Sequence, residues 1–346
     1  MKIIYDNIIF GLQKAGGIST YWGELSERLL RDNQDINFIE DKIDNLVRSE
    51  LKIMSENILK DSSFPQLINR FLPCKLPQLS NKFIFHSSYN RITSNKKAIQ
   101  VATVHDFVHE LHYKGFRQRL HSFQKNKAIN SASNIICVSE NTKHDLLRLN
   151  PKINPDIVKV IYNGVSKDFY KIENITKFER PYLLFIGSRE HYKNFGFVLQ
   201  LLNKMQDFDL AIVGRPLNKQ ETEFATSHLG NRFKVYSHIG NVELNKIYNS
   251  AYALLYPSSY EGFGIPLLEA MKTGLPFIGL NKSSIPEVAG KAGILLEQLD
   301  IELFRNAVLS IEEKRDNLIK EGFIQANKFS WEKCYQETLN VYKQLY

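Results

Sequence analysis

Two carboxylates flank a glycine-rich turn in the stretch SSYEGFGIPLLEAMKTG, residues 258–274. Glu261 stands immediately before Gly-Phe-Gly, and Glu269 follows eight residues later. A helix that only packs on a hydrophobic core needs neither carboxylate at those places. An ionised carboxylate accepts hydrogen bonds, and its two oxygens suit the paired hydroxyl groups of a vicinal diol. The two glutamates therefore indicate a bound ligand that carries hydroxyl groups.

The residues between the two glutamates have the signals of a helix start. Pro266 suits the first helical position, because its missing N–H has no helical partner to lose there. Gly274 suits the left-handed residue that ends a helix, so we expect a helix over 266–273. The first-turn amides, among them that of Leu267, are then free to bind an anion such as phosphate. The glycines before the helix let a ligand approach the backbone closely.

A phosphate at this helix start constrains what the two glutamates can do. Carboxylates repel phosphate, so Glu261 and Glu269 must bind hydroxyl groups on either side of it. A molecule that carries hydroxyls, then phosphate, then hydroxyls again is a nucleoside diphosphate sugar. One diol would be that of the ribose and the other that of the sugar. The local chemistry therefore predicts a nucleotide-sugar site.

The pattern E-G-F-G-x-P-x-x-E resembles the E-x7-E signature of the retaining glycosyltransferases of family 4. Members of that family have the two-domain GT-B fold. Their second glutamate holds the ribose hydroxyls, and their first contacts the donor sugar near the diphosphate. The resemblance implies the ribose role for Glu269 and the sugar role for Glu261.

Two cations follow a short apolar run in the second half of the chain. The stretch FIGSREHYKNF resembles the family's G-x-R-x-x-x-K-N, whose cations bind the donor diphosphate. By this resemblance Arg189 and Lys193, with Gly187 before them, belong to the donor site. Cleavage of the sugar–phosphate bond builds charge on the leaving diphosphate, and fixed cations stabilise that charge better than water does. Arginine offers a planar fork and lysine a point charge.

The first half of the chain contributes a glycine loop and a histidine at a strand end. Gly16 and Gly17 in IFGLQKAGGISTY precede a helix whose amides can face an anion. The loop lacks the G-x-G-x-x-G of dinucleotide-binding enzymes. His105 and Asp106 end an apolar strand and resemble the H-D of the family, which implies that His105 lies at the reaction centre. Asp106 either orients that imidazole or binds the acceptor.

These motifs together predict a set of donor-binding residues and a set of catalytic residues. The residues expected to bind the donor are Gly16, Gly17, Gly187, Arg189, Lys193, Gly214, Glu261, Gly262, Phe263, Gly264, Ile265, Pro266, Leu267 and Glu269. The expected catalytic residues are His105, Asp106, Glu261, Arg189 and Lys193. The D-F-D at 207–209 fits a D-x-D metal motif only nominally, because it begins a strand at the end away from the ligand. We therefore expect no metal ion and no other cofactor.

The elements that must position these residues are short strands alternating with amphipathic helices. Helical patterns include 141–149 and 194–205. Such alternation predicts an α/β protein with parallel sheets and helices on both faces, here two doubly wound Rossmann-like domains facing across a cleft. Ligands of such folds bind at the carboxyl ends of the strands. The strands expected from β-branched and aromatic runs are 2–5, 83–85, 99–104, 134–138, 158–161, 182–186, 208–213, 252–256 and 276–279.

A charged loop, SKDFYKIENITKFERP, interrupts the alternation and ends in Pro181. It predicts an N-terminal, acceptor-side domain over 1–164 and a nucleotide-sugar-binding domain over 165–330. Domains of this size are common for α/β folds. The last stretch has aromatic residues at helical spacing, which predicts a helix over 331–346 that packs back on the first domain.

The charge and the cysteine content of the chain indicate its cellular compartment and the partners it can bind. The 346 residues carry a net charge of +8, and three isolated cysteines form no disulfide framework or zinc motif. The cysteine pattern indicates a reducing compartment, so we expect a cytoplasmic protein. No apolar run is long enough to span a membrane. The basic, aromatic stretch KGFRQRLHSFQKNK is either a solvated helix face or a peripheral contact with the inner membrane surface. No nucleic-acid-binding signature accompanies the charge.

The segments GGISTY and TVHDF look most like a mannosyltransferase-like branch that builds bacterial surface polysaccharides. This resemblance implies a retaining hexosyltransferase that uses GDP-mannose. Its acceptor would be a lipid-linked oligosaccharide of O-antigen, capsule or related polysaccharide synthesis. Three alternatives remain open: a transferase using a UDP- or dTDP-sugar, a sugar-nucleotide epimerase, and a non-catalytic sugar-nucleotide-binding subunit.

Overall fold

The computed structural model describes residues 1–41, 43–60, 66–175 and 180–346. These residues form two compact units, one of Met1–Asn163 with Trp331–Tyr346 and one of Gly164–Ser330. The boundary expected from the sequence lies one residue away, and part of its charged loop (176–179) lies outside the described residues.

The first unit is built on a seven-stranded sheet with the order β3-β2-β1-β4-β5-β6-β7. Every neighbouring pair of strands is parallel. The strands are β1 (Ile3–Asp6), β2 (Ile36–Glu40), β3 (Ile58–Lys60), β4 (Phe83–Ser87), β5 (Ala98–Val104), β6 (Asn134–Cys137) and β7 (Val158–Val160). The helices are α1 (Ile9–Leu12), α2 (Gly17–Arg31), α3 (Leu46–Glu50), α4 (Gln66–Asn69), α5 (Val108–His112), α6 (Phe116–Ser131), α7 (Glu140–Leu149) and α15 (Trp331–Leu345).

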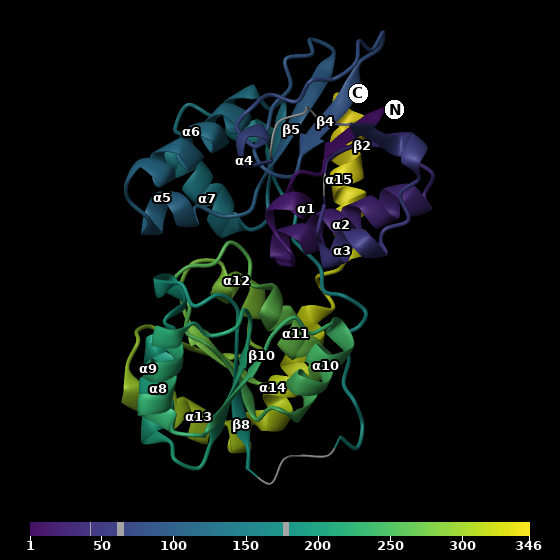
Figure 1. Ribbon diagram of the computed structural model, residues 1–346. Helices are drawn as coiled ribbons and strands as arrows, with labels where there is room; N and C mark the ends of the chain where they lie inside the picture. Colours follow the sequence, from purple (N-terminus) through teal and green to yellow (C-terminus); the bar gives the residue numbers. More distant parts are fainter. Residues whose placement is uncertain (42, 61–65, 176–179) are drawn as a thin grey trace. The chain divides into compact units, whose positions relative to one another are not determined.

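The second unit is built on a six-stranded parallel sheet with the order β10-β9-β8-β11-β12-β13. Helices cover both of its faces, with α8, α9 and α13 on one side and α10, α11 and α14 on the other (Figure 1). The strands are β8 (Tyr182–Ile186), β9 (Asp209–Val213), β10 (Phe233–Tyr236), β11 (Ala253–Tyr256), β12 (Phe277–Leu280) and β13 (Ile294–Leu296). The helices are α8 (Phe195–Lys204), α9 (Lys219–Leu229), α10 (Asn241–Ser250), α11 (Ile265–Thr273), α12 (Ile285–Ala289), α13 (Ile301–Leu309) and α14 (Ile311–Ala326).

The strand order of the second unit determines where a ligand can bind. From β8 the chain first adds β9 and β10 on one side, then returns to add β11, β12 and β13 on the other. The switch point is therefore between β8 and β11, and ligands of such sheets bind at the carboxyl ends of the strands there. The loops after these two strands carry Arg189, Lys193 and Glu261.

The C-terminal helix α15 belongs to the first unit, where it runs beside α2 (Figure 1). Its aromatic stripe is buried, and the Tyr342 hydroxyl lies 2.8 Å from the Tyr5 hydroxyl and 2.5 Å from Nδ1 of His86. Burial lowers the pKa of His86 to about 3, so this imidazole is neutral at pH 7. The helix is thus tied to the sheet by both packing and a buried polar cluster.

All nine strands expected from the sequence are present, but the sequence analysis missed β2, β3, β10 and β13. The last three are short edge strands that are only partly buried, so their sequences carry no long apolar run. Strand β2 is buried, but Asn37 interrupts its apolar pattern and Glu40 ends it. That glutamate is accommodated by the guanidinium of Arg48 and the amide of Asn7. In the described ranges, no helix is both long and apolar enough to cross a bilayer.

Candidate active site

Lys193 and Glu261 form an ion pair at the carboxyl edge of the second sheet. Lys193 ends a short 3-10 helix (His191–Lys193) after β8, and Glu261 lies in the loop after β11. Their side chains are only 13% and 11% exposed. The ammonium group also lies 5.7 Å from the ring centroid of Tyr256 and would be 3.9 Å from a Cβ atom placed on Gly187. The structure thus brings together three of the predicted donor-site residues.

The Glu-Gly-Phe-Gly turn is fixed by two serines that precede α12. The Ser283 hydroxyl accepts a hydrogen bond from the Glu261 amide at 2.9 Å. The Ser284 hydroxyl lies 2.9 Å from the carbonyl oxygens of both Glu261 and Phe263. Gly264 has a φ of 107°, which favours glycine. The turn is therefore a preformed feature of the second unit.

Helix α11 begins at Ile265, so Pro266 is its second residue and not its first as predicted. Because Pro266 still lies in the first turn, it loses no helical hydrogen bond. The amide of Leu267 already bonds the carbonyl of Gly264 at 3.0 Å. It is therefore not the free anion-binding amide that the sequence analysis expected. Gly262 and Ile265 are partly exposed beside this turn.

Glu269 is a half-buried carboxylate on α11 that accepts a hydrogen bond from the Tyr248 hydroxyl at 2.6 Å. Burial raises the pKa of Glu269 to about 7, although the bond from Tyr248 acts in the opposite direction. Burial and then the nearby charge of Glu261 hold the pKa of Tyr256 well above its usual range, and Glu269 adds to this effect. Tyr256 therefore interacts with both glutamates, and the two carboxylates share one neighbourhood.

Arg189 lies in the loop after β8, with its guanidinium turned inward. The side chain is only 1% exposed and pairs with Glu221 at the start of α9. Gly214, after β9, supports this arrangement, because a Cβ atom there would lie 2.6 Å from the carbonyl oxygen of Gly187 and 3.4 Å from Nη1 of Arg189. Both predicted donor-site cations are thus paired with carboxylates of the same unit.

The predicted residues of the first unit lie at the starts of α2 and α5. Gly16 and Gly17 are exposed, and the carbonyl oxygen of Gly16 accepts bonds from the hydroxyls of Ser19 and Thr20. These contacts keep the start of α2 in place. The first-turn amides are the part of this loop that can face an anion.

His105 follows β5 and packs edge-on against Tyr21, with ring centroids 5.0 Å apart. Burial lowers its pKa to about 4, so the imidazole is neutral at pH 7. Nε2 of His105 is buried and has no hydrogen-bond partner within the described part of the chain. This nitrogen lacks the hydrogen-bond partner that buried polar atoms usually have.

Asp106 does not contact the His105 imidazole by any hydrogen bond in the ranges described. Its carboxylate accepts from the Val108 amide at 3.0 Å, and its carbonyl oxygen accepts from Lys125 Nζ at 2.9 Å. Of its two predicted roles, the structure offers no contact for orienting the imidazole. The carboxylate instead orders the start of α5.

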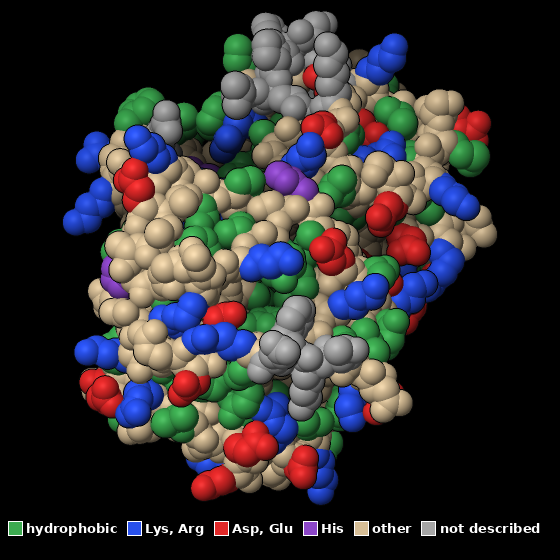
Figure 2. Space-filling view, turned by 60° about the horizontal axis from the view of Figure 1, so that its bottom comes forward, with side chains coloured by type: hydrophobic (Ala, Val, Ile, Leu, Met, Phe, Trp, Pro, Cys, Tyr) green, Lys and Arg blue, Asp and Glu red, His purple; other side chains and the backbone are tan. Residues whose placement is uncertain are grey.

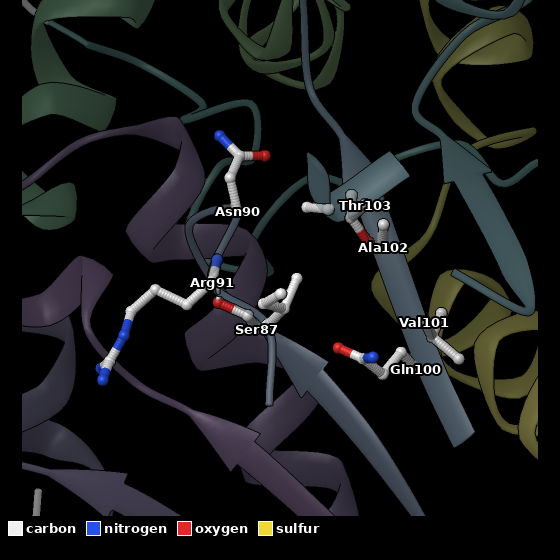
Figure 3. Close-up of a pocket in the computed structure, with 9 residues that line it drawn as sticks. Ser87, Asn90, Arg91, Gln100, Val101, Ala102 and Thr103 are labelled. Atoms are coloured by element: carbon white, nitrogen blue, oxygen red, sulfur yellow. Dashed lines mark hydrogen bonds between the residues drawn. The ribbon is translucent and has the colours of Figure 1, made fainter. Parts of the chain in front are cut away.

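Two other features contain no residue of the predicted site. Asp209 of the D-F-D stretch begins β9, at the opposite edge from Gly214, and pairs with Arg180 at 2.8 Å. A cavity of about 10 Å³ in the first unit is lined by Ser87, Gln100 and Thr103, among others (Figure 3). It has room for about one water molecule and not for a sugar.

The sequence analysis missed the partners that hold the site residues. These are Glu221, Tyr248, Tyr256, Ser283 and Ser284. Tyr256 ends the strand immediately before the Glu261 loop, and the other four come from other helices and loops. The spacing of the motifs indicated none of their contacts.

Comparison with known proteins gives a match for each unit. The family described as "Glycosyltransferase Family 4" matches residues 15–169, and "Glycosyl transferases group 1" matches residues 166–327. O-antigen chain mannosyltransferase B of Escherichia coli is 28% identical over 287 residues, which are 76% of this chain and 74% of that protein.

Solved structures share the fold over nearly the whole chain. Sucrose-phosphate synthase from Thermosynechococcus elongatus matches with a TM-score of 0.77 and 17% identity, over 100% of this chain and 99% of that one. Anabaena HepE in complex with UDP-glucose matches with a TM-score of 0.77 and 15% identity, over 99% of this chain and 100% of that one. Both matches show a common two-domain architecture.

Proposed function

Because this chain belongs to the family 4 glycosyltransferases, we propose that it transfers a sugar, with retention of configuration, from a nucleoside diphosphate donor to a lipid-linked oligosaccharide. The observation that carries the proposal is the contact between Lys193 and Glu261 beside Gly187. A cation for a diphosphate and a carboxylate for sugar hydroxyls are in contact at the switch point of the sheet. A ligand that carries a diphosphate next to sugar hydroxyls, as a nucleotide sugar does, matches this pair.

We assign roles to the site residues from their chemistry. Lys193 and Arg189 stabilise the negative charge of the leaving diphosphate. Glu269 binds the ribose hydroxyls, and Glu261 binds the sugar once Lys193 turns to the phosphate. His105, neutral and with an unpartnered Nε2, contacts hydroxyl groups on the acceptor side of the reaction.

The proposed reaction is a front-face displacement. The bond from the anomeric carbon to the β-phosphate oxygen breaks, and a bond to the acceptor oxygen forms on the same face. The departing β-phosphate takes the proton of the acceptor hydroxyl, so the products are the glycosylated acceptor and a nucleoside diphosphate. Isolation of a covalent sugar adduct on Glu261 would contradict this route, because a nucleophilic carboxylate would then carry the sugar.

The donor is tested by the thermal stability of the protein with UDP, GDP, dTDP, CDP or ADP, each with and without EDTA. A ligand at a hundred times its Kd stabilises a protein by about 2.7 kcal/mol, which raises the melting temperature by about 5–11 °C at this domain size. We expect GDP to raise the melting temperature most, since the matched E. coli relative is a mannosyltransferase, and we expect EDTA to change nothing.

Each other result of this panel has a defined meaning. A larger shift with UDP would indicate that the donor is a UDP-sugar and not GDP-mannose. UDP-glucose is the ligand bound in the HepE structure. A loss of the shift in EDTA would contradict the metal-free site. No shift with any diphosphate would remove the support for a donor site at Lys193 and Glu269. Product analysis with acceptor then separates a transferase from an epimerase or a non-catalytic binding subunit.

We further propose that α6 contacts the membrane that holds the acceptor. Phe116 and Phe123 are 79% and 68% exposed, and seven residues separate them, so they lie on one side of the helix. Arg119 and Lys127 are also exposed on α6. Lys125 is not part of this surface, because it is buried and pairs with Glu110 at 2.8 Å. The side chain of Arg117 lies outside the described residues.

Exposed phenylalanines between basic residues suit an anionic lipid surface. On the face drawn in Figure 2, side chains of Lys, Arg, Asp and Glu are intermixed. We expect the protein to sediment with vesicles of anionic phospholipid and not with zwitterionic vesicles. Alanine at both Phe116 and Phe123 should lower the bound fraction at least tenfold, by loss of about 1.5–3 kcal/mol for each ring. Met54→Ala, at a 60% exposed residue, is the control.

A further inference from the structure

We propose that Glu221 is a positioning residue for donor binding, because it holds the buried guanidinium of Arg189 in a position that leaves Nη1 for the donor diphosphate. The inference rests on the proposed function, since it assigns a task to Arg189 at the same site. It adds a residue of α9 that no motif of the chain contains.

Arg189 and Glu221 form an ion pair. Nε of Arg189 lies 3.1 Å from Oε1 of Glu221, and Nη2 donates to Oε2 at 3.1 Å. Nη2 also donates to the carbonyl oxygen of Pro216 at 2.9 Å. Nη2 is therefore hydrogen-bonded by the protein itself, whereas Nε meets the carboxylate at ion-pair distance without a hydrogen bond. The two bonds of Nη2 and the ion pair together hold the arginine in position.

Nη1 of Arg189 is buried, and among the described residues it has no hydrogen-bond partner. It lies beside Gly214, where a Cβ atom would be 3.4 Å away. Gly214 in turn abuts Gly187, the residue that Lys193 lies against. Nη1 and the Lys193 ammonium thus lie beside the same two adjoining glycines. Because buried polar atoms are usually hydrogen-bonded, we expect a ligand oxygen to accept a hydrogen bond from Nη1.

Glu221 is itself held in place. Asn218 and Glu221 form a reciprocal capping box at the start of α9, and Arg215 donates to Oε1 at 2.9 Å. Burial alone would favour its protonated form, but the bonds from Arg189 and from the Asn218 amide hold the pKa of Glu221 below its usual value. The carboxylate is therefore charged at pH 7. It supplies the counter-charge that a guanidinium with 1% exposure needs.

The variant that tests this inference is Glu221→Gln. Glutamine still fits the capping box, so the start of α9 is kept while the charge is removed. Glu223→Gln is the matched control, because Glu223 lies on the same helix with its side chain 66% exposed. Calorimetry would measure the affinity for the nucleoside diphosphate that binds the wild-type protein, and for its parent nucleoside.

We expect Glu221→Gln to bind the diphosphate about tenfold more weakly. A change of this size is expected when one charged hydrogen bond to the diphosphate is lost or misplaced. Its affinity for the nucleoside, and both affinities of Glu223→Gln, should not change. In an Arg189→Ala background, Glu221→Gln should have no further effect on diphosphate affinity, because the residue it positions is gone.

Three outcomes would overturn the inference. They are equal or tighter diphosphate binding by Glu221→Gln, an equal loss for the nucleoside, and additive effects of the Arg189 and Glu221 changes. If the glutamine variant does not fold, Glu221→Asp takes its place. The shorter side chain keeps the charge but does not reach the Arg189 guanidinium, so the same tenfold loss of affinity is expected. If the wild-type protein binds no nucleoside diphosphate, the proposed function fails. If it binds one and Glu221 has no effect, only this inference fails.

Discussion

Replacement of Lys193 by alanine is expected to lower the rate of sugar transfer by about 10²–10³-fold, the usual loss for one fixed group that stabilises transition-state charge. The ammonium group is held beside Glu261, Gly187 and the ring of Tyr256, so its charge is fixed in position. The measurement is release of nucleoside diphosphate from the donor found in the thermal panel. Lipid-linked saccharide from bacterial membranes serves as the acceptor.

The control for this variant is Lys204→Ala, at an exposed lysine that ends α8 and has no part in the site. It should keep the wild-type rate. The rate should be compared at saturating donor, so that weaker binding is not mistaken for a slower chemical step. A Lys193→Ala protein with more than a tenth of the wild-type rate would show that this lysine does not stabilise the leaving group.

Replacement of Glu269 by glutamine is expected to weaken donor binding about a hundredfold at pH 8, because two hydrogen bonds from ribose hydroxyls to a carboxylate are lost or reduced. The same variant should remove the pH dependence of binding. With its pKa at about 7, Glu269 is largely ionised at pH 8 and largely protonated at pH 6. Since only the ionised form accepts both hydroxyls, wild-type affinity should fall about tenfold as the pH falls from 8 to 6.

The measurement is a calorimetric titration with the intact nucleotide sugar, whose diester phosphates stay ionised over this range. Glu313→Gln, at an exposed residue of α14, should retain both the affinity and the pH dependence of the wild-type protein. Tyr248→Phe should move the midpoint of the pH dependence upward, because it removes the hydrogen bond that favours the ionised carboxylate. Wild-type affinity that stays constant between pH 6 and pH 8 would rule out Glu269 as the ribose ligand.

The sequence predicted the architecture where burial was complete on both faces of a strand. Strands such as β8 and β11 are continuous apolar runs, because helices cover them on both sides. The edge strand β10 is half-exposed, and its sequence FKVY carries too weak a pattern to be found. Strand β2 was missed for a different reason, because it is buried but Asn37 and Glu40 break its apolar pattern, and the groups that accommodate Glu40, on Arg48 and Asn7, lie outside the strand.

The chain by itself determined which residues carry the chemistry: the carboxylates of Glu261 and Glu269 and the cations Arg189 and Lys193 stand in short local patterns next to strand ends. Only the tertiary structure decided the state of each group. Glu221 turns the Arg189 guanidinium inward, Lys193 pairs with Glu261, and burial brings the pKa of Glu269 to about 7. The reason is physical. Residue type and local spacing are written along the chain, whereas charge pairing and desolvation depend on atoms that folding brings together from distant segments.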